Sequence, residues 1–184
     1  MGLLEEVWQW YECARDSIEA TVHQIKTDLG AIPPSLVFAR HVSPGEALRN
    51  LGKAKEELDD LTVLALFAVF EQELLQHLLL TSEDVRSRVP ARLQECLLTR
   101  AFRGIERWPL DEVLDVYKAT IDQDLVGLVK QVKDYRDWVA HGKKGPPDAS
   151  IDPSNAYERL TRFLGGLTWV ASDGSQSVSS PAVK

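Results

Sequence analysis

The stretch YRDWVAHGKK, residues 135–144, places Arg136, Asp137 and His141 within six positions of one another. A histidine that titrates near neutral pH can remove the proton from a ribose 2′-hydroxyl group, and a guanidinium can stabilise the charge that grows on a phosphoryl group. These residue types could therefore cleave a phosphodiester bond in RNA. A plainer interpretation also fits, in which Arg136 forms a surface ion pair and His141 belongs to a solvated helix end.

The spacing of these residues decides which of them share a face of a helix. At about 100° per residue, His141 lies roughly 140° further round the helix than Arg136, so the two diverge on a single ideal helix. Asp137 and His141 are four residues apart and share a face. We therefore expect the Asp137 carboxylate to accept a hydrogen bond from the His141 imidazole and to favour its charged form, as the negative end of the helix dipole does.

The charge of this stretch differs from that of the whole chain. The 184 residues carry a formal net charge of −7, which gives the protein no general affinity for nucleic acid and predicts no DNA specificity. Residues 130–144 are nevertheless rich in basic side chains, and a local excess of positive charge is typical of a phosphate site. The candidate RNA-binding residues are Lys130, Lys133, Lys143 and Lys144.

The elements that must position these residues are predicted to be helices throughout. We expect one all-α domain over residues 1–170, a bundle of about five to seven helices joined by short connections. The Ser-rich segment 171–184 has few large apolar groups and is predicted to be a disordered tail.

Residues that favour helix starts and ends divide the predicted bundle into segments. The run 61–80 is apolar on nearly every side as far as Phe70, and it is predicted to lie in the middle of the bundle. The pattern TSED at 81–84 resembles a capping box and predicts a new helix start, and Pro90 predicts another helix running to Trp108. Asp152 and Pro153 predict the start of the last helix.

A regular apolar stripe predicts one long helix that carries the candidate site and ends at Gly142. The stripe consists of Leu114, Tyr117, Ile121, Leu125, Leu128, Val132, Tyr135 and Val139.

Arg136 and His141, with an acid directly after the arginine, resemble the R-x4–6-H signature of HEPN domains. The apolar segment FAVFEQELLQHL, the glycine after the histidine and the final segment DPSNAYERLTRFL also fit that layout. The resemblance covers the arrangement of residues 1–170, whereas its sequence-specific part is confined to about residues 135–145. HEPN domains are all-α and are common among prokaryotic toxins and defence ribonucleases.

This resemblance implies a metal-independent endoribonuclease in which a homodimer brings two Arg–His pairs into one cleft. His141 is then the acid and base, Arg136 stabilises the phosphoryl transition state, and Asp137 positions one of the two. The implied products are a 2′,3′-cyclic phosphate and a 5′-hydroxyl, and a protein antitoxin or other inhibitor is an expected partner. Some members carry a modified tyrosine two positions after the histidine. Lys143 stands there instead, which puts that mode of control in doubt.

Two other interpretations stay open. The chain could be a non-catalytic helical module that binds a nucleotide, an RNA end or a protein in the same cleft, or a dimerisation domain without a ligand. His77 is expected at the edge of the core or at an interface rather than in a catalytic role, and Trp138 either packs at an interface or stacks on a base.

Several classes are not indicated. The two cysteines are isolated and the four histidines lack metal-ligand spacing, so we expect no metal and no cofactor. The longest apolar run, 61–70, is about half of the roughly 20 residues that a membrane span needs, and the acidic N-terminus does not resemble a secretory signal. The sequence therefore predicts a cytoplasmic protein without membrane association.

Overall fold

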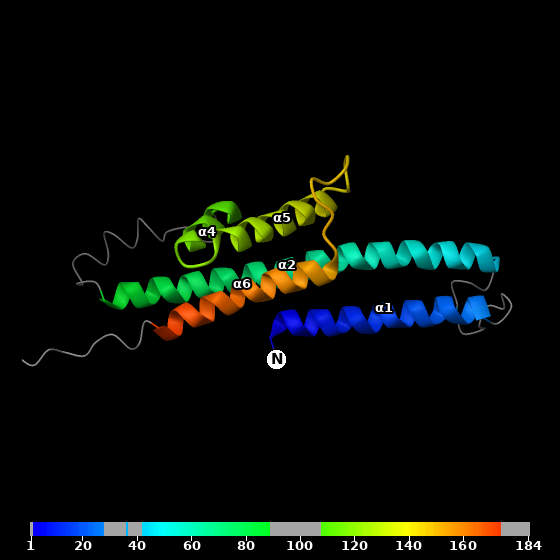
Figure 1. The fold of residues 1–184 in the computed structure, drawn as a ribbon, viewed down its shortest axis with the longest axis horizontal. Helices are drawn as coiled ribbons and strands as arrows, with labels where there is room; N and C mark the ends of the chain where they lie inside the picture. The colour runs from blue at the N-terminus through cyan, green and yellow to red at the C-terminus, as the bar shows by residue number, and fades with distance from the viewer. Residues whose placement is uncertain (1, 28–35, 37–41, 89–107, 174–184) are drawn as a thin grey trace, which may run out of the picture.

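The computed structural model describes residues 2–27, 36, 42–88 and 108–173 (Figure 1). These described residues form five α-helices and one 3₁₀ turn, without a strand. In chain order the elements are α1 (Leu3–Thr27), α2 (Pro44–Arg88), α4 (Leu110–Val116), η3 (Tyr117–Ala119), α5 (Gln123–Ala140) and α6 (Pro153–Asp173). The all-α prediction is confirmed. The number of helices in the whole bundle stays a prediction, because residues 89–107 lie outside the described part.

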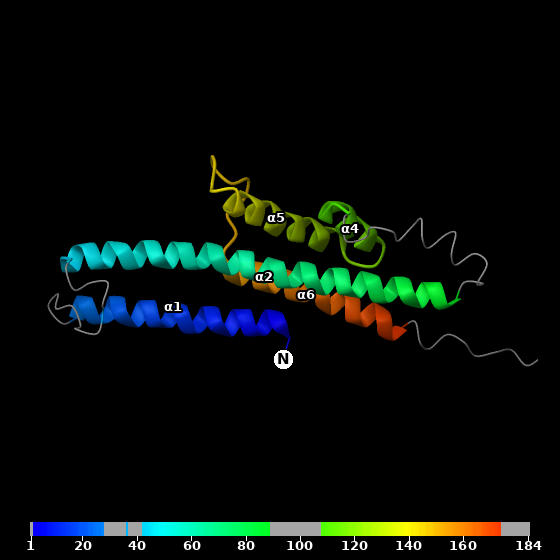
Figure 2. The same ribbon diagram turned by 180° about the vertical axis from the view of Figure 1, so that it is seen from behind.

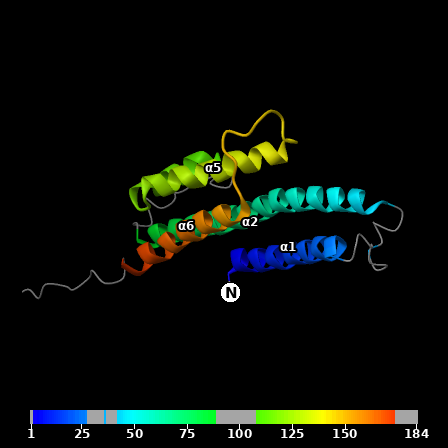
Figure 3. The same cartoon turned by 45° about the vertical axis from the view of Figure 1, so that its right-hand side comes forward.

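The 45-residue helix α2 is the element against which α1, α5 and α6 pack. Helix α1 lies along its N-terminal part and α6 along its C-terminal part, while α5 packs on both α2 and α6 (Figures 1 and 2). Figure 3 shows that α1 and the N-terminal part of α2 extend beyond α5 and α6 as a two-helix arm. The C-terminal end of α5 therefore lies near the middle of α2, where the arm joins the rest of the bundle.

The main core lies where α2, α4, α5 and α6 meet. Val63, Phe67, Phe70 and Leu74 recur at helical spacing on one side of α2 and are fully buried. The Phe163 ring of α6 packs edge-on against Phe70 with 5.4 Å between ring centroids. A second, smaller cluster around Ile25, Ala47 and Leu51 holds the arm together. The prediction that the 61–80 segment lies in the middle of the bundle is wrong: one side of it faces these helices, while Leu61, Ala68, Leu79 and Leu80 are exposed on the other side.

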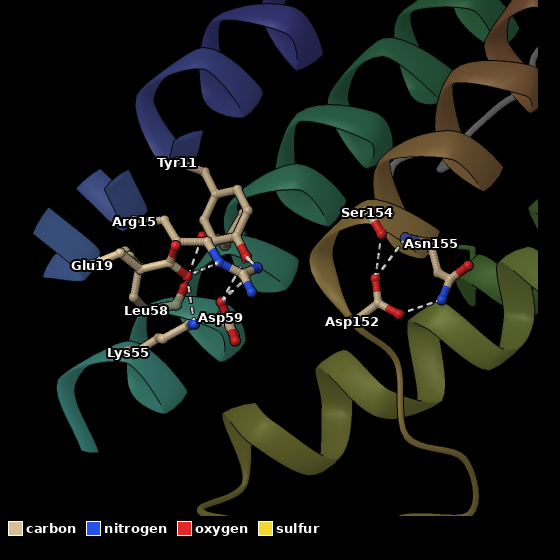
Figure 4. A network of polar contacts seen from close by, with 10 residues as sticks. Tyr11, Arg15, Glu19, Lys55, Leu58, Asp59, Asp152, Ser154 and Asn155 are labelled. Atoms are coloured by element: carbon tan, nitrogen blue, oxygen red, sulfur yellow. Dashed lines mark hydrogen bonds and ion pairs between the residues drawn. The ribbon is translucent and has the colours of Figure 1, made fainter. Parts of the chain in front are cut away.

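Polar contacts also fasten α1 to α2 (Figure 4). The Tyr11 hydroxyl, whose side chain is buried, donates a 2.7 Å hydrogen bond to Asp59, and Arg15 forms an ion pair with the same carboxylate. Further along the arm, Lys55 contacts Glu19 at 2.6 Å. These contacts fix the register of the two helices.

Two predicted boundaries are wrong. The TSED pattern does not start a helix, because α2 continues to Arg88 and the hydroxyls of Thr81 and Ser82 bond back to carbonyls of the preceding turn. The single long helix is divided: α4 and η3 end near Thr120, and α5 restarts behind Asp122, whose side chain accepts a hydrogen bond from the Asp124 backbone N–H at 2.8 Å.

The start of the last helix is predicted correctly. Helix α6 begins at Pro153, and Asp152 caps it by accepting hydrogen bonds from the Asn155 backbone and the Ser154 hydroxyl (Figure 4). Its other end extends to Asp173, beyond residue 170, and residues 174–184 of the predicted tail lie outside the described part.

By length and composition alone, α2 contains a stretch within Pro44–Ser82 that could cross a membrane, as core helices of other proteins also do. This stretch is longer than the uninterrupted apolar run at 61–70 because it includes polar residues around Glu71. The absence of membrane association stays a prediction.

Candidate functional site at the end of α5

The C-terminal end of α5 has a defined geometry. His141 is the C-cap residue of α5, and Gly142 follows it with a φ of 80°. The backbone N–H of Gly142 donates to the Val139 carbonyl at 3.0 Å, and that of Lys143 donates to the Trp138 carbonyl at 2.9 Å. This is the Schellman pattern, which needs a residue with positive φ after the cap and explains the glycine.

Three contacts orient Arg136, two with residues of α2 and one with its neighbour on α5. One terminal nitrogen lies 3.5 Å from a Glu71 oxygen, and the other lies 3.0 Å from an Asp137 oxygen. The guanidinium carbon stands 4.7 Å from the centre of the Phe67 ring, a distance at which a cation is attracted to the ring face. The Arg136 Nε is buried and has no hydrogen-bond partner. The guanidinium is therefore oriented, 26% of the side chain stays exposed, and several N–H groups remain unused.

His141 lies apart from these contacts. The side chain is exposed, and within the described residues its imidazole has no hydrogen-bond or ion-pair partner. The expected bond between Asp137 and His141 is not observed. The Asp137 carboxylate instead contacts Arg136 and the Lys133 ammonium, the latter at 3.4 Å. The structure therefore places Asp137 beside the arginine and leaves the histidine open to solvent.

Lys143 fastens the segment after the histidine to α2. Its ammonium lies 2.5 Å from Asp60 and 2.8 Å from Glu57, and the Tyr135 hydroxyl donates to the other Asp60 oxygen at 2.6 Å. These hydrogen bonds to Asp60 and Glu57 hold the pKa of Lys143 above its usual value. We call Asp60, Tyr135 and Lys143 the α2–α5 clamp. It ties both sides of His141 to a single helix.

The other predicted RNA-binding lysines also face carboxylates from neighbouring elements. Lys130 contacts Asp115 at 2.7 Å, and Lys133 contacts Asp111 at 3.0 Å. Burial alone lowers the pKa of Lys133, but the hydrogen bonds to Asp111 and Asp134 raise it above its usual value.

The excess of basic residues along the sequence is therefore offset in space by acids from α2 and α4. Lys144 is exposed and, in the described part of the chain, has no partner.

Two further aromatic or imidazole side chains are explained by packing. The Trp138 indole N–H donates to the Gly145 carbonyl at 2.8 Å, and its ring packs beside Tyr135, so it supports the loop after α5. His77 lies half-buried at the core edge, as expected, with Nδ1 3.1 Å from the Tyr117 hydroxyl. Burial lowers the pKa of His77, which favours the neutral imidazole.

The acids that complete the site were missed in the sequence. Asp60 and Glu71 lie about three helical turns apart on α2 and therefore face nearly the same side. Their position at the ends of the apolar run 61–70 was a usable signal, because a charge next to a core segment needs a partner. No cluster of three or more metal-ligating side chains occurs among the described residues.

Comparison with known proteins gives this site no precedent. No family model matches the chain, and no curated protein and no solved structure is significantly similar to it. The geometry of α5 and its partners on α2 is therefore the basis for any functional assignment.

Proposed function

We propose that this protein is a metal-independent endoribonuclease of the HEPN type that acts as a homodimer, in the role of a toxin or defence effector restrained by a protein partner. The observation that carries the proposal is an oriented Arg136 and an unpartnered, exposed His141 at the end of one helix. The backbone of His141 ends α5, but the described residues give its side chain no partner, so the imidazole is free to meet a substrate.

In the proposed reaction, the imidazole of one His141 removes the proton from a ribose 2′-hydroxyl. The 2′-oxygen attacks the adjacent phosphorus, and the bond from phosphorus to the 5′-oxygen breaks. The leaving 5′-oxygen takes a proton from His141 of the partner subunit, so that a 2′,3′-cyclic phosphate and a 5′-hydroxyl form without water or metal. The N–H groups of Arg136 that no carboxylate uses stabilise the charge on the phosphoryl oxygens.

Asp137 and Glu71 are assigned to positioning. They hold the guanidinium from two sides while Phe67 lies against it. A rotamer-rich side chain that is already ordered loses less entropy when it binds a phosphate. Lys144 is the remaining lysine of the segment that can contact RNA, whereas Lys143 supports the position of His141.

One observation favours the second candidate, a non-catalytic module that binds a nucleotide or an RNA end. The positive charge of Arg136 is already offset by two carboxylates. This pairing reduces the electrostatic attraction between Arg136 and a negatively charged transition state. It affects the capacity of the guanidinium to donate directed hydrogen bonds less.

Cleavage of single-stranded RNA in EDTA tests the proposal. We expect the wild-type protein to cut, and His141→Ala and Arg136→Ala each to lower the rate by at least about 100-fold. His23→Ala is the matched control, because His23 is an exposed histidine on α1, and it should cut at the wild-type rate.

The products decide the chemistry. Fragments that end in a 2′,3′-cyclic phosphate support attack by the 2′-oxygen. Cleavage that survives both site substitutions contradicts the assignment. RNA binding without cleavage, lost in Arg136→Ala, supports the non-catalytic module.

A further inference from the structure

The loop between α5 and α6 closes a small pocket against the side of α5. The pocket has a volume of about 120 Å³. Two aromatic rings of α5 and two prolines of the loop form its apolar walls, and one carboxylate from each segment also lines it. The lining includes Asp134, Tyr135, Trp138, Pro146, Pro147 and Asp148. We call this space the Trp138 pocket.

The aromatic wall of the Trp138 pocket is held in a fixed position. The Trp138 indole N–H donates to the Gly145 carbonyl at 2.8 Å, and the indole packs beside Tyr135 with 5.4 Å between ring centroids. The Tyr135 hydroxyl in turn donates to Asp60 at 2.6 Å. A wall that is already ordered loses little conformational entropy when a ligand stacks on it.

The charge that lines the pocket is negative. Asp134 and Asp148 are both exposed, and no lysine or arginine of the described residues lines the pocket. Asp148 has no hydrogen-bond or ion-pair partner in the described part of the chain. Asp134 contacts the Lys133 ammonium at 3.3 Å through one oxygen, and its side chain is 57% exposed. The pocket therefore offers carboxylate oxygens to a positively charged group.

Two cations beside the pocket are engaged with other groups. Lys133 also contacts Asp111 at 3.0 Å. Arg159 of α6 donates to the side chain of Gln131, another lining residue, at 3.2 Å. Neither cation contacts Asp148, so the negative charge of the pocket is offset only in part.

We propose that the Trp138 pocket binds the guanidinium of an arginine side chain that belongs to a protein partner. A guanidinium is flat and positively charged, so it stacks on the indole while its N–H groups donate to a carboxylate in their own plane. Cation–π attraction needs the charge within about 6 Å of a ring centre, which a pocket walled by two rings provides. A lysine ammonium is a compact point charge without a flat face, so it fits this pocket less well.

Two other ligands suit the same pocket less well. A nucleobase would stack on Trp138, but its phosphate would approach two carboxylates. Clefts that hold whole small molecules measure roughly 300–1,000 Å³, whereas about 120 Å³ suits the end of one side chain. Free arginine would bring its own carboxylate close to Asp134 and Asp148, while within a polypeptide that group is a neutral amide.

The pocket adjoins the candidate site. The His141 backbone N–H still makes a helical bond to the Asp137 carbonyl at 2.9 Å. Trp138 and His141 are three residues apart, so they are neighbours on the surface of α5. A partner that inserts an arginine beside Trp138 would therefore cover the exposed imidazole. Only this last step rests on the proposed function, to which it adds the chemistry of the restraining protein, whereas the binding of arginine does not.

Nuclear magnetic resonance of the ¹⁵N-labelled protein tests the pocket through the Trp138 indole N–H, whose signal is identified by its loss in Trp138→Phe. The probe is N-acetyl-arginine methylamide, the arginine diamide, in which both ends are neutral as in a polypeptide. We expect it to shift this signal with a dissociation constant on the order of 1 mM, because only a few contacts are made. The citrulline diamide has a similar shape without the charge and should bind at least about 10-fold more weakly.

Matched variants locate the charge that binds the probe. Asp134→Asn and Asp148→Asn should each weaken binding of the arginine diamide by about 5- to 10-fold, because asparagine keeps the shape of the side chain but not its charge. Asp16→Asn is the control: Asp16 is an exposed acid on α1, and its replacement changes the net charge by the same amount. This variant should bind as the wild type does. The same spectra establish that each variant is folded.

Several outcomes would overturn the proposal. A Trp138 signal that does not move at tens of millimolar arginine diamide shows that the pocket takes no guanidinium. Equal binding of the citrulline diamide, or unchanged binding by both Asp134→Asn and Asp148→Asn, contradicts recognition by charge. Tighter binding of free L-arginine than of the diamide favours a free amino acid over a protein partner. A shift with guanosine monophosphate and none with the arginine diamide favours a nucleobase.

The RNA cleavage assay separates the pocket from the nuclease. A saturating concentration of the arginine diamide should slow His141-dependent cleavage, and the citrulline diamide should not. Binding of the diamide by a protein that never cuts RNA supports the pocket and contradicts the proposed function. His141-dependent cleavage by a protein that does not bind the diamide keeps the nuclease and overturns the pocket. Binding that leaves cleavage unchanged overturns the step in which the partner covers His141.

Discussion

Replacing Lys143 with alanine and, separately, with glycine distinguishes the ion pairs of this residue from the strain in its backbone. Its ammonium contacts Asp60, whose side chain is 12% exposed, and Glu57, whose side chain is 63% exposed. Its backbone has φ of 55°, the only positive value for a non-glycine residue in the described part. Both substitutions remove the ion pairs, but only glycine also removes the Cβ that the left-handed conformation disfavours.

The magnitudes follow from these environments. A hydrogen bond to a charged group contributes about 1.5–3 kcal/mol when it is shielded, and an exposed pair contributes at most about 1 kcal/mol. Since Lys143 itself is 31% exposed, we expect Lys143→Ala to lower the free energy of unfolding by about 2 kcal/mol. Relief of the left-handed strain should make Lys143→Gly about 1 kcal/mol less destabilised than the alanine variant.

Urea unfolding followed by circular dichroism measures both differences. Lys144→Ala is the control, because the neighbouring lysine is exposed and should change stability by less than about 0.5 kcal/mol. An alanine variant as stable as wild type would refute the clamp, and a glycine variant no more stable than alanine would refute the strain argument. If Lys143 mainly bound RNA, its removal would weaken RNA binding while leaving stability unchanged.

Two further predictions concern the fold. Asp152→Ala should lower the free energy of unfolding by about 1 kcal/mol in urea titrations, because the first turn of α6 loses its cap, and an unchanged value would contradict the capping role. Burial, then the hydrogen bond to Asp59, raises the pKa of Tyr11 to about 12, above the usual value near 10 of an unfolded chain. The stability gained because the folded state keeps this hydroxyl protonated is complete below about pH 10 and is lost as the pH rises towards 12. The urea midpoint should therefore decrease over that pH range, and it should decrease less in Tyr11→Phe.

The sequence predicted burial better than it predicted helix boundaries. Leu114, Tyr117, Ile121 and Leu125 are all buried as the stripe indicates, although the helix that was to carry them is interrupted. Periodicity reports which side meets the core, and two short helices on the same core can keep that side in common. The interruption had a local signal, since Asp122 is a good capping residue two positions before the N–H group that it binds.

The site was predictable only along its own helix. The end of α5 at His141 and Gly142 follows from local rules, and so does the Asp137 neighbour of Arg136. Glu71 and Asp60 are distant in sequence and approach α5 only because α2 and α5 pack against each other. Charge counted along the chain therefore indicated a basic site, whereas the folded arrangement pairs most of those cations.

Because Asp60 and Glu71 belong to one uninterrupted helix, the number of residues between them fixes both their separation along α2 and their relative direction around it. They meet Lys143 and Arg136, and residues 60 and 71 are in phase on the helix. Inserting or deleting one amino acid in that interval would turn one acid about 100° away from its cation while the other stayed in place. Natural variation in length should therefore avoid this interval of α2 and fall instead in the interhelical connections.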